Sequence, residues 1–275
     1  MTLMPDVFDD QYIGCTEAME EAAPRLMEVE MKVHKALREE WNKAKEKWNS
    51  VKESVAKDLP KVFKEEYGRA IIGYCSGLLN RELNDAVRQS GSSRATYNSS
   101  FHFKAFHYYL TRALQLLRKS CNVTYKTPVY RGIEEVRYQQ SGSDIMRFGY
   151  FASSSFNKIK AEEFGVDTFF TIHTCFGVDI GKFSYFEEEE VLIPIHEIFQ
   201  VFPGDVGDNS YVLRSTNQTC SQFNCAYLGN EKKKSCEYKA ALGQGITFLL
   251  QMSPALFGGS ILQVNAAALK LFATF

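Results

Sequence analysis

The spacing of apolar residues along this sequence changes once, near Cys121, and that change constrains the fold more than any other feature. Before it, apolar residues recur at the three- and four-residue spacing of amphipathic helices; after it, short β-branched and aromatic runs alternate with Gly and Pro. Helices that all precede the strands are typical of an α+β protein. The sequence therefore predicts a helical lobe over residues 1–120 packed against a β-rich lobe over residues 121–240.

The helical stripe is clearest inside the segment Thr16 to Lys57, and Pro60 ends it. We expect its apolar residues to pack on a core, namely Leu37, Trp41, Ala44, Trp48, Val51 and Val55. Two further helices are predicted over residues 61–88 and 101–118, with a turn at residues 90–93 between them. His102 and His107 are five residues apart and share no helix face, so we interpret both as structural or exposed.

The second half predicts strands over residues 128–131, 148–155, 168–175, 190–202, 211–215 and 246–250. It contains neither a GxGxxG nor a GxxxxGK[ST] motif, so a Rossmann or P-loop site is not indicated. With 275 residues, 45% hydrophobic, the chain can bury a core as one large domain or two subdomains. A net charge of -1 argues against a general nucleic-acid binder.

The seven cysteines include no CxxC pair and the five histidines are scattered, so we predict disulfides and no metal site. Sequons at Asn98, Asn122 and Asn217 are compatible with a secretory route. An odd number of cysteines leaves at least one thiol outside intrachain disulfides, and Cys75 in the apolar run AIIGYC is our candidate.

The two ends of the sequence carry information about the cellular compartment of the protein. Residues 1–10 lack the basic and apolar regions of a signal peptide, which taken literally indicates a cytosolic protein, but we interpret the N-terminus as incomplete and expect an extracellular protein. Residues 241–275 form an apolar tail in which Lys270 is the single charge after residue 245. The tail is either a lipid-anchor (GPI) signal or a frayed C-terminus, and its polar interruptions argue against a membrane span.

Four consecutive carboxylates in Phe186 to Pro194, reading FEEEEVLIP, meet a buried-strand pattern that Pro194 terminates. Taken alone, such a run is typical of a solvated turn. Beside the strand, however, Glu190 is held at a strand edge, and the two-residue period predicts that Glu188 points to the same side. Two such carboxylates can divide labour, one stabilising a cation while the other handles a proton or an incoming base.

Two other spots carry polar groups at predicted strand ends. Tyr130-Arg131-Gly132 places a guanidinium beside a glycine, a pattern that suits a diphosphate but also fits a surface arginine. The FASSS segment, residues 151–155, either ends a strand with three hydroxyls or caps the helix that carries Ala161 and Phe164.

The order and spacing of YRG, FASSS and EEEEVLIP resemble the arginine, serine and ExE signature of the vertebrate ecto mono-ADP-ribosyltransferases, which are arginine-specific and NAD-dependent. Four other segments are similar to family segments: FDDQYIGC, FHFKAFHYYLTRALQLLR, TIHTCFGVDI and FNCAYLG. The resemblance covers roughly residues 6–230 and implies that family's fold, a helical lobe against a β-sandwich-like core.

The resemblance also implies roles for matching residues. Arg131 would hold the NAD phosphates and ribose, and Ser153 would orient the nicotinamide ribose and brace the catalytic strand. Glu190 would be the catalytic carboxylate, and Glu188 the acid that confers arginine acceptance. Gly132 would lie at the cofactor beside Arg131.

Less central positions follow from the same resemblance. Ser184 and Phe164 would line the NAD pocket. Cys15 would pair with Cys225 and Cys121 with Cys175, which leaves Cys220 and Cys236 for an extra bridge. Two registers stay open: Glu187 and Glu189 also satisfy ExE, and Ser154 is the alternative to Ser153.

The implied activity moves ADP-ribose from NAD, with NADP as an alternative co-substrate, to a guanidinium nitrogen of acceptor proteins and releases nicotinamide. No metal is needed, no nucleic-acid partner is expected, and the resemblance is to a monomer that a lipid anchor can attach to a membrane. The alternatives are an NAD glycohydrolase and a catalytically silent surface protein that binds NAD. The presence of all four residues, Arg131, Ser153, Glu188 and Glu190, argues against the silent alternative.

Overall fold

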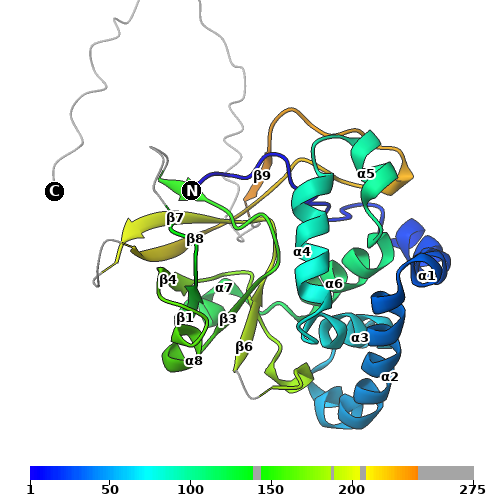
Figure 1. Ribbon diagram of the computed structural model, residues 1–275, viewed down its shortest axis with the longest axis horizontal. Coiled ribbons are helices and arrows are strands. Elements are labelled where there is room, and N and C mark those ends of the chain that lie inside the picture. Colours follow the sequence, from blue (N-terminus) through cyan, green and yellow to red (C-terminus); the bar gives the residue numbers. More distant parts are fainter. Residues whose placement is uncertain (139–143, 187–188, 205–208, 241–275) are drawn as a thin grey trace, which may run out of the picture. The chain divides into compact units, whose positions relative to one another are not determined.

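Helices fill the first half of the chain and strands the second (Figure 1). The computed structural model describes residues 1–138, 144–186, 189–204 and 209–240. Its helices before the first strand are α1 (Thr16–Val33), α2 (Lys35–Val55), α3 (Glu65–Tyr74), α4 (Leu79–Ser90), α5 (Arg94–Ser100), α6 (Lys104–Leu117) and α7 (Cys121–Thr124). The predicted α+β class, with a helical part followed by strands, is confirmed.

The single helix expected over residues 16–57 is two helices, because the chain breaks at His34. His34 has extended backbone angles, φ -118° and ψ 95°, and its Nδ1 accepts the N–H of Leu37 at 3.2 Å. An imidazole in this position caps α2 and satisfies one of the N–H groups that a helix start leaves without a partner. The predicted apolar stripe lies within α2, and its members are buried except for the half-buried Val51.

The helix expected over residues 61–88 is also broken, into α3 and α4. Gly77 lies in the connection with φ +80°, a backbone conformation that glycine adopts at no steric cost. The turn expected at residues 90–93 leads into α5, a helix that the sequence pattern did not predict. The Oγ of Ser93 accepts the N–H of Thr96 at 3.1 Å and so caps α5.

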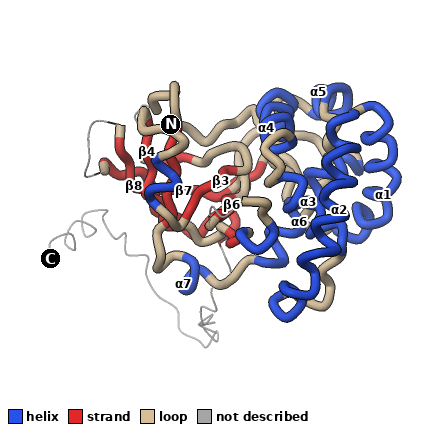
Figure 2. The backbone as a smooth tube through the Cα atoms, turned by 60° about the horizontal axis from the view of Figure 1, so that its bottom comes forward, coloured by secondary structure: helices blue, strands red, loops and turns tan. Residues whose placement is uncertain are grey.

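The strands join into one hydrogen-bonded sheet, which Figure 2 shows gathered beside the helices. They are β1 (Val129–Ile133), β2 (Ile145–Met146), β3 (Ala152–Ser155), β4 (Thr168–His173), β5 (Val178–Asp179), β6 (Glu190–Ile193), β7 (Glu197–Pro203), β8 (Ser210–Ser221) and β9 (Glu237–Ala240). Their order is β2-β7-β8-β4-β1-β3-β6-β5, with β9 on β8. Only the β4–β8 pair of the described strands is parallel.

Short elements account for the remaining differences. The strand expected over residues 190–202 is β6 and β7, and the gap between them begins at Pro194, which has no N–H to continue a ladder. The sequence pattern did not predict the two-residue strands β2 and β5, nor β9.

Among the residues that the structure describes, no helix combines the length and the apolar character needed to cross a bilayer. The strand expected at 246–250 and the whole tail, 241–275, lie outside the described residues.

Two apolar clusters meet at β6. The first contains the helical core and takes Leu192 from β6, whereas the second lies within the sheet and takes Val191 and Ile193. This alternation follows from the two-residue period of a strand. The strand that begins at Glu190 therefore lies at the junction of the helical part and the sheet.

Three disulfides link Cys15 to Cys225, Cys121 to Cys175, and Cys220 to Cys236. The first two are the expected pairs and the third is the extra bridge that the remaining cysteines allowed. Cys75 is buried and takes part in none of them, as predicted.

The start of the chain is bonded to the end of the described fold. Asp9 accepts the backbone N–H groups of Gln222 and Phe223 and forms a fully buried ion pair with Arg147, with 2.6 Å between Oδ2 and Nη1. Asp10 accepts the N–H groups of Cys225 and Ala226 at 2.9 and 2.8 Å. These bonds close the molecule around its N-terminal segment.

Candidate active site

Three neighbouring strands bring three of the predicted residues to one place. Arg131 lies on β1, Ser153 on β3 and Glu190 at the start of β6, and β1, β3 and β6 are adjacent in the sheet. A cavity of about 60 Å³ lies at this point, and we call it the Arg131 recess. The described residues that line it are Tyr130, Arg131, Gly132, Ser153, Ser154, Ser155, Ala161, Phe164 and Glu190.

Arg131 brings a positive charge into a largely buried setting. Its Nη1 donates a hydrogen bond to the carbonyl oxygen of Ser153, which ties β1 to β3, and its guanidinium lies 5.7 Å from the ring centroid of Tyr150. Burial raises the pKa of the Tyr150 hydroxyl, but the charge of Arg131 and the other polar neighbours outweigh burial, so this pKa is lowered. Such a site favours an anionic ligand.

The three serines have different surroundings. Ser154 donates its Oγ hydrogen to the carbonyl oxygen of Val191 at 3.1 Å, and so joins β3 to β6. The Oγ of Ser155 accepts the N–H of Asn157 at 2.9 Å. Ser153 is half-buried and lines the recess. The segment thus ends a strand, and Asn157 caps the following helix, α8 (Lys158–Glu162), by accepting the N–H groups of Ile159 and Lys160.

Gly132 is required for the packing of α8 on β1. A Cβ at this position would lie 2.2 Å from the carbonyl oxygens of Ala161 and Gly165, which is far inside contact distance. The close approach holds the end of α8 beside the recess. Phe164, just beyond α8, lines the recess although 56% of its surface is exposed. An exposed aromatic ring at the edge of a cavity can stack on a flat ligand.

Glu190 is buried, with 6% of its surface exposed. Its carbonyl oxygen accepts the N–H of Ile180 at 2.9 Å, which fixes the start of β6. Its carboxylate accepts a hydrogen bond from the thiol of Cys75, with 3.4 Å between Sγ and Oε2. The sequence predicted a buried Cys75 but gave no sign of this contact, which joins residues 115 positions apart.

Glu189 is the other member of the acidic run that the structure describes. Glu189, directly before β6, is exposed and has φ +48°, so its backbone is not extended. Alternation along a strand needs extended backbone, so β6 begins at Glu190, and the side to which Glu188 points stays a prediction. Glu187 and Glu188 themselves lie outside the described residues.

Ser184 ends the short 3-10 helix η2 (Gly181–Phe183) and is buried. Its Oγ accepts the N–H of Phe186 at 3.1 Å. It is not among the described residues that line the Arg131 recess.

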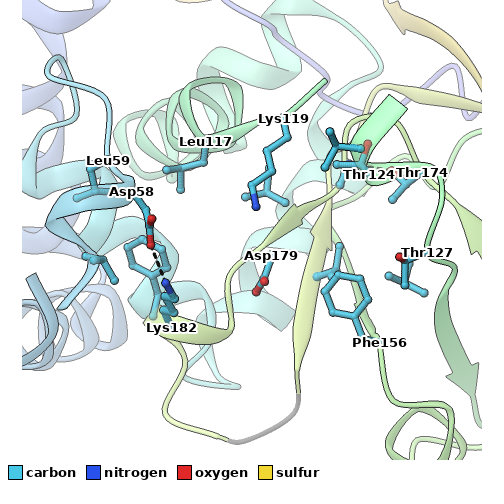
Figure 3. Close-up of a pocket in the computed structure, with 17 residues that line it drawn as sticks. Asp58, Leu59, Leu117, Lys119, Thr124, Thr127, Phe156, Thr174, Asp179 and Lys182 are labelled. Atoms are coloured by element: carbon cyan, nitrogen blue, oxygen red, sulfur yellow. Dashed lines mark hydrogen bonds and ion pairs between the residues drawn. The ribbon is translucent and has the colours of Figure 1, made fainter. Parts of the chain in front are cut away.

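A larger cavity, of about 490 Å³, is lined by residues of the helical part and of the sheet (Figure 3). Glu190 of β6 lines the Arg131 recess, whereas its neighbour Val191 lines this larger cavity. Figure 3 shows Lys119 directed into it, and Lys182 paired with Asp58 at 2.6 Å. It contains none of the predicted site residues, and we therefore assign the candidate chemistry to the smaller recess.

No group of three or more potential metal ligands occurs among the described residues.

The family model described as NAD:arginine ADP-ribosyltransferase matches residues 1–221. The chain therefore belongs to this family of ADP-ribosyltransferases. Among its relatives, ecto-ADP-ribosyltransferase 5 of Homo sapiens is 48% identical over 252 residues, which cover 88% of this chain and 86% of the relative. The same enzyme of Rattus norvegicus is 44% identical over 279 residues, 98% of this chain and 89% of the relative.

A solved structure with the same fold is that of the eukaryotic mono-ADP-ribosyltransferase ART2.2. It has a TM-score of 0.73 and 40% sequence identity, and the match covers 82% of this chain and 97% of that one. Mutants of ART2.2 have been solved in complex with NADH and with NAD. The relatives are ecto-enzymes and this chain has three disulfides, and together these indicate an extracellular protein.

Proposed function

We propose that this protein is an arginine-specific mono-ADP-ribosyltransferase, which moves ADP-ribose from NAD to a guanidinium nitrogen of acceptor proteins. One observation carries the proposal: Arg131, Ser153, Phe164 and Glu190 line a single recess although they lie on separate elements. Family membership supports the class of reaction, and NAD in the complexes of ART2.2 supports the co-substrate.

We assign the binding of NAD to the Arg131 side of the recess. The Arg131 guanidinium, beside Gly132, can donate two hydrogen bonds to a phosphate of the dinucleotide. Ser153 orients the nicotinamide ribose, and Phe164 packs on a flat ring of the co-substrate. A volume of about 60 Å³ suits only one part of NAD, so the rest of the dinucleotide lies along the surface. We keep Ser184 as a more distant contributor through the loop before Glu190.

Glu190 is the proposed catalytic carboxylate. Cleavage of the bond between nicotinamide and ribose sends its electron pair to the nicotinamide nitrogen and leaves positive charge on the ribose. A carboxylate fixed beside that charge stabilises the transition state more than the ground state. Burial strengthens the effect, because the water that would screen the charge is excluded.

The acceptor arginine then attacks the ribose carbon. A guanidinium is protonated in water and becomes nucleophilic only when it gives up a proton, so a second carboxylate is needed to hold it and accept that proton. We propose Glu188 for this role. The products are ADP-ribosylated arginine, neutral nicotinamide and one proton.

The division of the chain is a proposal as well. Residues 1–120 form the helical lobe, residues 121–240 form the lobe that binds NAD, and residues 241–275 are a tail whose role in lipid anchoring is a separate question. The bond between Cys75 and Glu190 supports close cooperation of the two lobes, since it links a helix of the first to a strand of the second.

The test is to express the full chain in an oxidising secretory compartment and to incubate it with labelled NAD and agmatine, a small guanidino acceptor. Glu190→Ala is expected to lose both agmatine labelling and NAD hydrolysis by at least about 100-fold. Glu188→Gln is expected to lose mainly the labelling. Glu189→Gln, a change in the neighbouring exposed acid, is the matched control and leaves both intact.

The alternatives predict other results. Consumption of NAD by the wild type without labelled agmatine would make the protein an NAD glycohydrolase. Binding of NAD without turnover in a folded, disulfide-bonded sample would make it a silent binding protein. Labelling that survives Glu190→Ala but not Glu189→Gln would shift the register of the acidic run. A parallel assay with NADP decides between the two co-substrates.

A further inference from the structure

The C-terminal end of α3 lies against both strands that carry Ser153 and Glu190. Tyr74, the last residue of α3, donates its hydroxyl hydrogen to the carbonyl oxygen of Phe151 at 2.7 Å, just before β3. Cys75, the next residue, donates its thiol hydrogen to Oε2 of Glu190 at 3.4 Å. One helix end thus contacts the backbone before β3 and the side chain at the start of β6.

The contact between Cys75 and Glu190 lies away from solvent. Cys75 is 5% exposed and Glu190 6%. A thiol is a weak donor, but a hydrogen bond to an ionised acceptor is stronger than one between neutral groups, and a low local dielectric strengthens it further. The three disulfides use the other six of the seven cysteines, so Cys75 keeps its hydrogen for this bond.

The sulfur is held in place by the residues around it. Asn84 of α4 donates its amide to the carbonyl oxygen of Phe151 at 3.0 Å and accepts the N–H of Phe151, also at 3.0 Å. The same amide lies 3.2 Å from the Tyr74 hydroxyl. These bonds connect α3, α4 and the start of β3 immediately beside Cys75, so the thiol is presented to Glu190 from a fixed backbone.

We propose that Cys75 is a positioning residue for Glu190, whose carboxylate it orients through a hydrogen bond to Oε2. The proposal rests on the catalytic role given to Glu190 above. A carboxylate that is already oriented does not have to be ordered when charge develops on the ribose, and this preorganisation lowers the barrier. Cys75 itself touches neither NAD nor the acceptor.

The contact can be tested without any activity. Since Cys75 is the one cysteine outside the disulfides, the S–H stretching band in the Raman spectrum of the full chain reports on it alone. Glu190→Ala removes the acceptor and is expected to move the band to higher wavenumber. Ser76→Ala, a change in the next residue whose buried hydroxyl has no hydrogen-bond partner in the described part of the chain, is the matched control and leaves the band in place. A band that Glu190→Ala does not move would overturn the proposal.

The catalytic consequence is tested with three substitutions. Cys75→Ala and Cys75→Val remove the donor, the second while filling the space, and both are expected to lower kcat for agmatine labelling about tenfold with little change in KM for NAD. Cys75→Ser keeps a donor and is expected to restore most of the rate. Because a donor stabilises an ionised carboxylate, the acid limb of the pH–rate profile of the Ala and Val variants should move to higher pH.

The opposite order of activity among the Cys75 variants would contradict the proposal. If Cys75→Val is as active as the wild type and Cys75→Ser is not, the residue only fills space and the proposal fails. If the wild type neither labels agmatine nor hydrolyses NAD, the proposed function fails, and the Raman band then decides on the contact by itself.

Discussion

Glu190 shows what single residues contribute to this molecule. The sequence predicted its place at the edge of a buried strand, since FEEEEVLIP joins acids to a β-branched run. It did not predict the thiol of Cys75 on the carboxylate, because that contact depends on how α3 crosses the start of β6. The same limit applies to Tyr150, whose ring lies beside the Arg131 guanidinium. Neighbours in sequence can be read from a pattern, whereas neighbours in space require the fold.

His107 is another residue whose surroundings decide its chemistry. Its Nδ1 is hydrogen-bonded to the Tyr12 hydroxyl at 2.8 Å and its ring is packed among Phe8, Phe101 and Phe151. Burial, assisted by the charge of His196, lowers the pKa of His107 from 6.5 to about 3. The folded protein therefore keeps this imidazole neutral at a pH where the unfolded chain protonates it.

We expect His107 to make the protein less stable in mild acid. Its folded-state pKa is depressed, so its contribution is fully present above about pH 6.5 and is lost as the pH falls towards 3. Between pH 7 and pH 5 the loss amounts to about 2 kcal/mol of unfolding free energy. His107→Asn, which keeps a polar group near the position of Nδ1 but does not titrate, should remove that part of the pH dependence.

Urea unfolding of both proteins at pH 7 and pH 5 measures the effect. The comparison between proteins is needed because burial raises the pKa of Asp10 to about 6 and that of Glu30 to about 8, and these groups act in the opposite direction. Asp10 and Glu30 are present in both proteins, so their contributions to the pH dependence of the unfolding free energy cancel in the comparison. His102→Asn, the same substitution at an exposed histidine in the same segment, is the matched control. Equal slopes for wild type and His107→Asn would contradict the assignment.

At the scale of elements, the sequence predicted types better than boundaries. The α2 stripe is regular enough to identify a helix, but the break at His34 depends on a cap that the imidazole makes to Leu37. The sequence did not predict which strands pair. The strands β4 and β8 pair in parallel across 36 residues that include β5, β6 and β7, and no local pattern encodes that partner. The candidate site nevertheless could be predicted in outline, because a polar motif ends β3 and another begins β6, although Arg131, expected at a strand end, lies in the middle of β1.

The packing of α8 on β1 gives a test at this scale. We expect Gly132→Ala to displace α8, because the added Cβ meets two backbone carbonyl oxygens that cannot rotate away. The cost should be about 1–3 kcal/mol of unfolding free energy, as for other overpacked sites. Displacement of α8 also moves Phe164, so the Kd for NAD should rise. Thermal unfolding and equilibrium binding of NAD measure the two effects.

Gly181→Ala is the matched control. Its added Cβ would find its nearest neighbour, Oδ1 of Asp179, at 3.4 Å, which is ordinary contact. We expect a change within about 0.5 kcal/mol and unaltered NAD binding. If both glycine variants behave alike, the close approach of α8 to β1 does not shape the recess.

At the scale of the whole molecule, the disulfides differ in how much chain they enclose. Cys15–Cys225 spans 210 residues and Cys121–Cys175 spans 54. In the chain-entropy description a disulfide restricts the unfolded chain more when its loop is longer.

We therefore expect the double variant Cys15→Ser, Cys225→Ser to lose more stability than Cys121→Ser, Cys175→Ser. Each loss should fall within about 2–5 kcal/mol, and the difference should be about 1 kcal/mol. Urea unfolding of the two double variants under non-reducing conditions provides the measurement. A larger loss for the shorter loop would mean that contacts in the folded state, and not the freedom of the unfolded chain, dominate.

The bonds of Asp9 and Asp10 to residues 222–226 also set an order of events during synthesis. The segment that contains Asp9 and Asp10 leaves the ribosome early, since the groups it binds are made more than 200 residues later. At about 5–20 residues per second, that interval lasts roughly 10–40 s. Until then the segment has neither its hydrogen-bond partners nor the cysteine that locks it. The protein can therefore complete this part of its fold only after residues 222–226 have been made and have returned to Asp9 and Asp10.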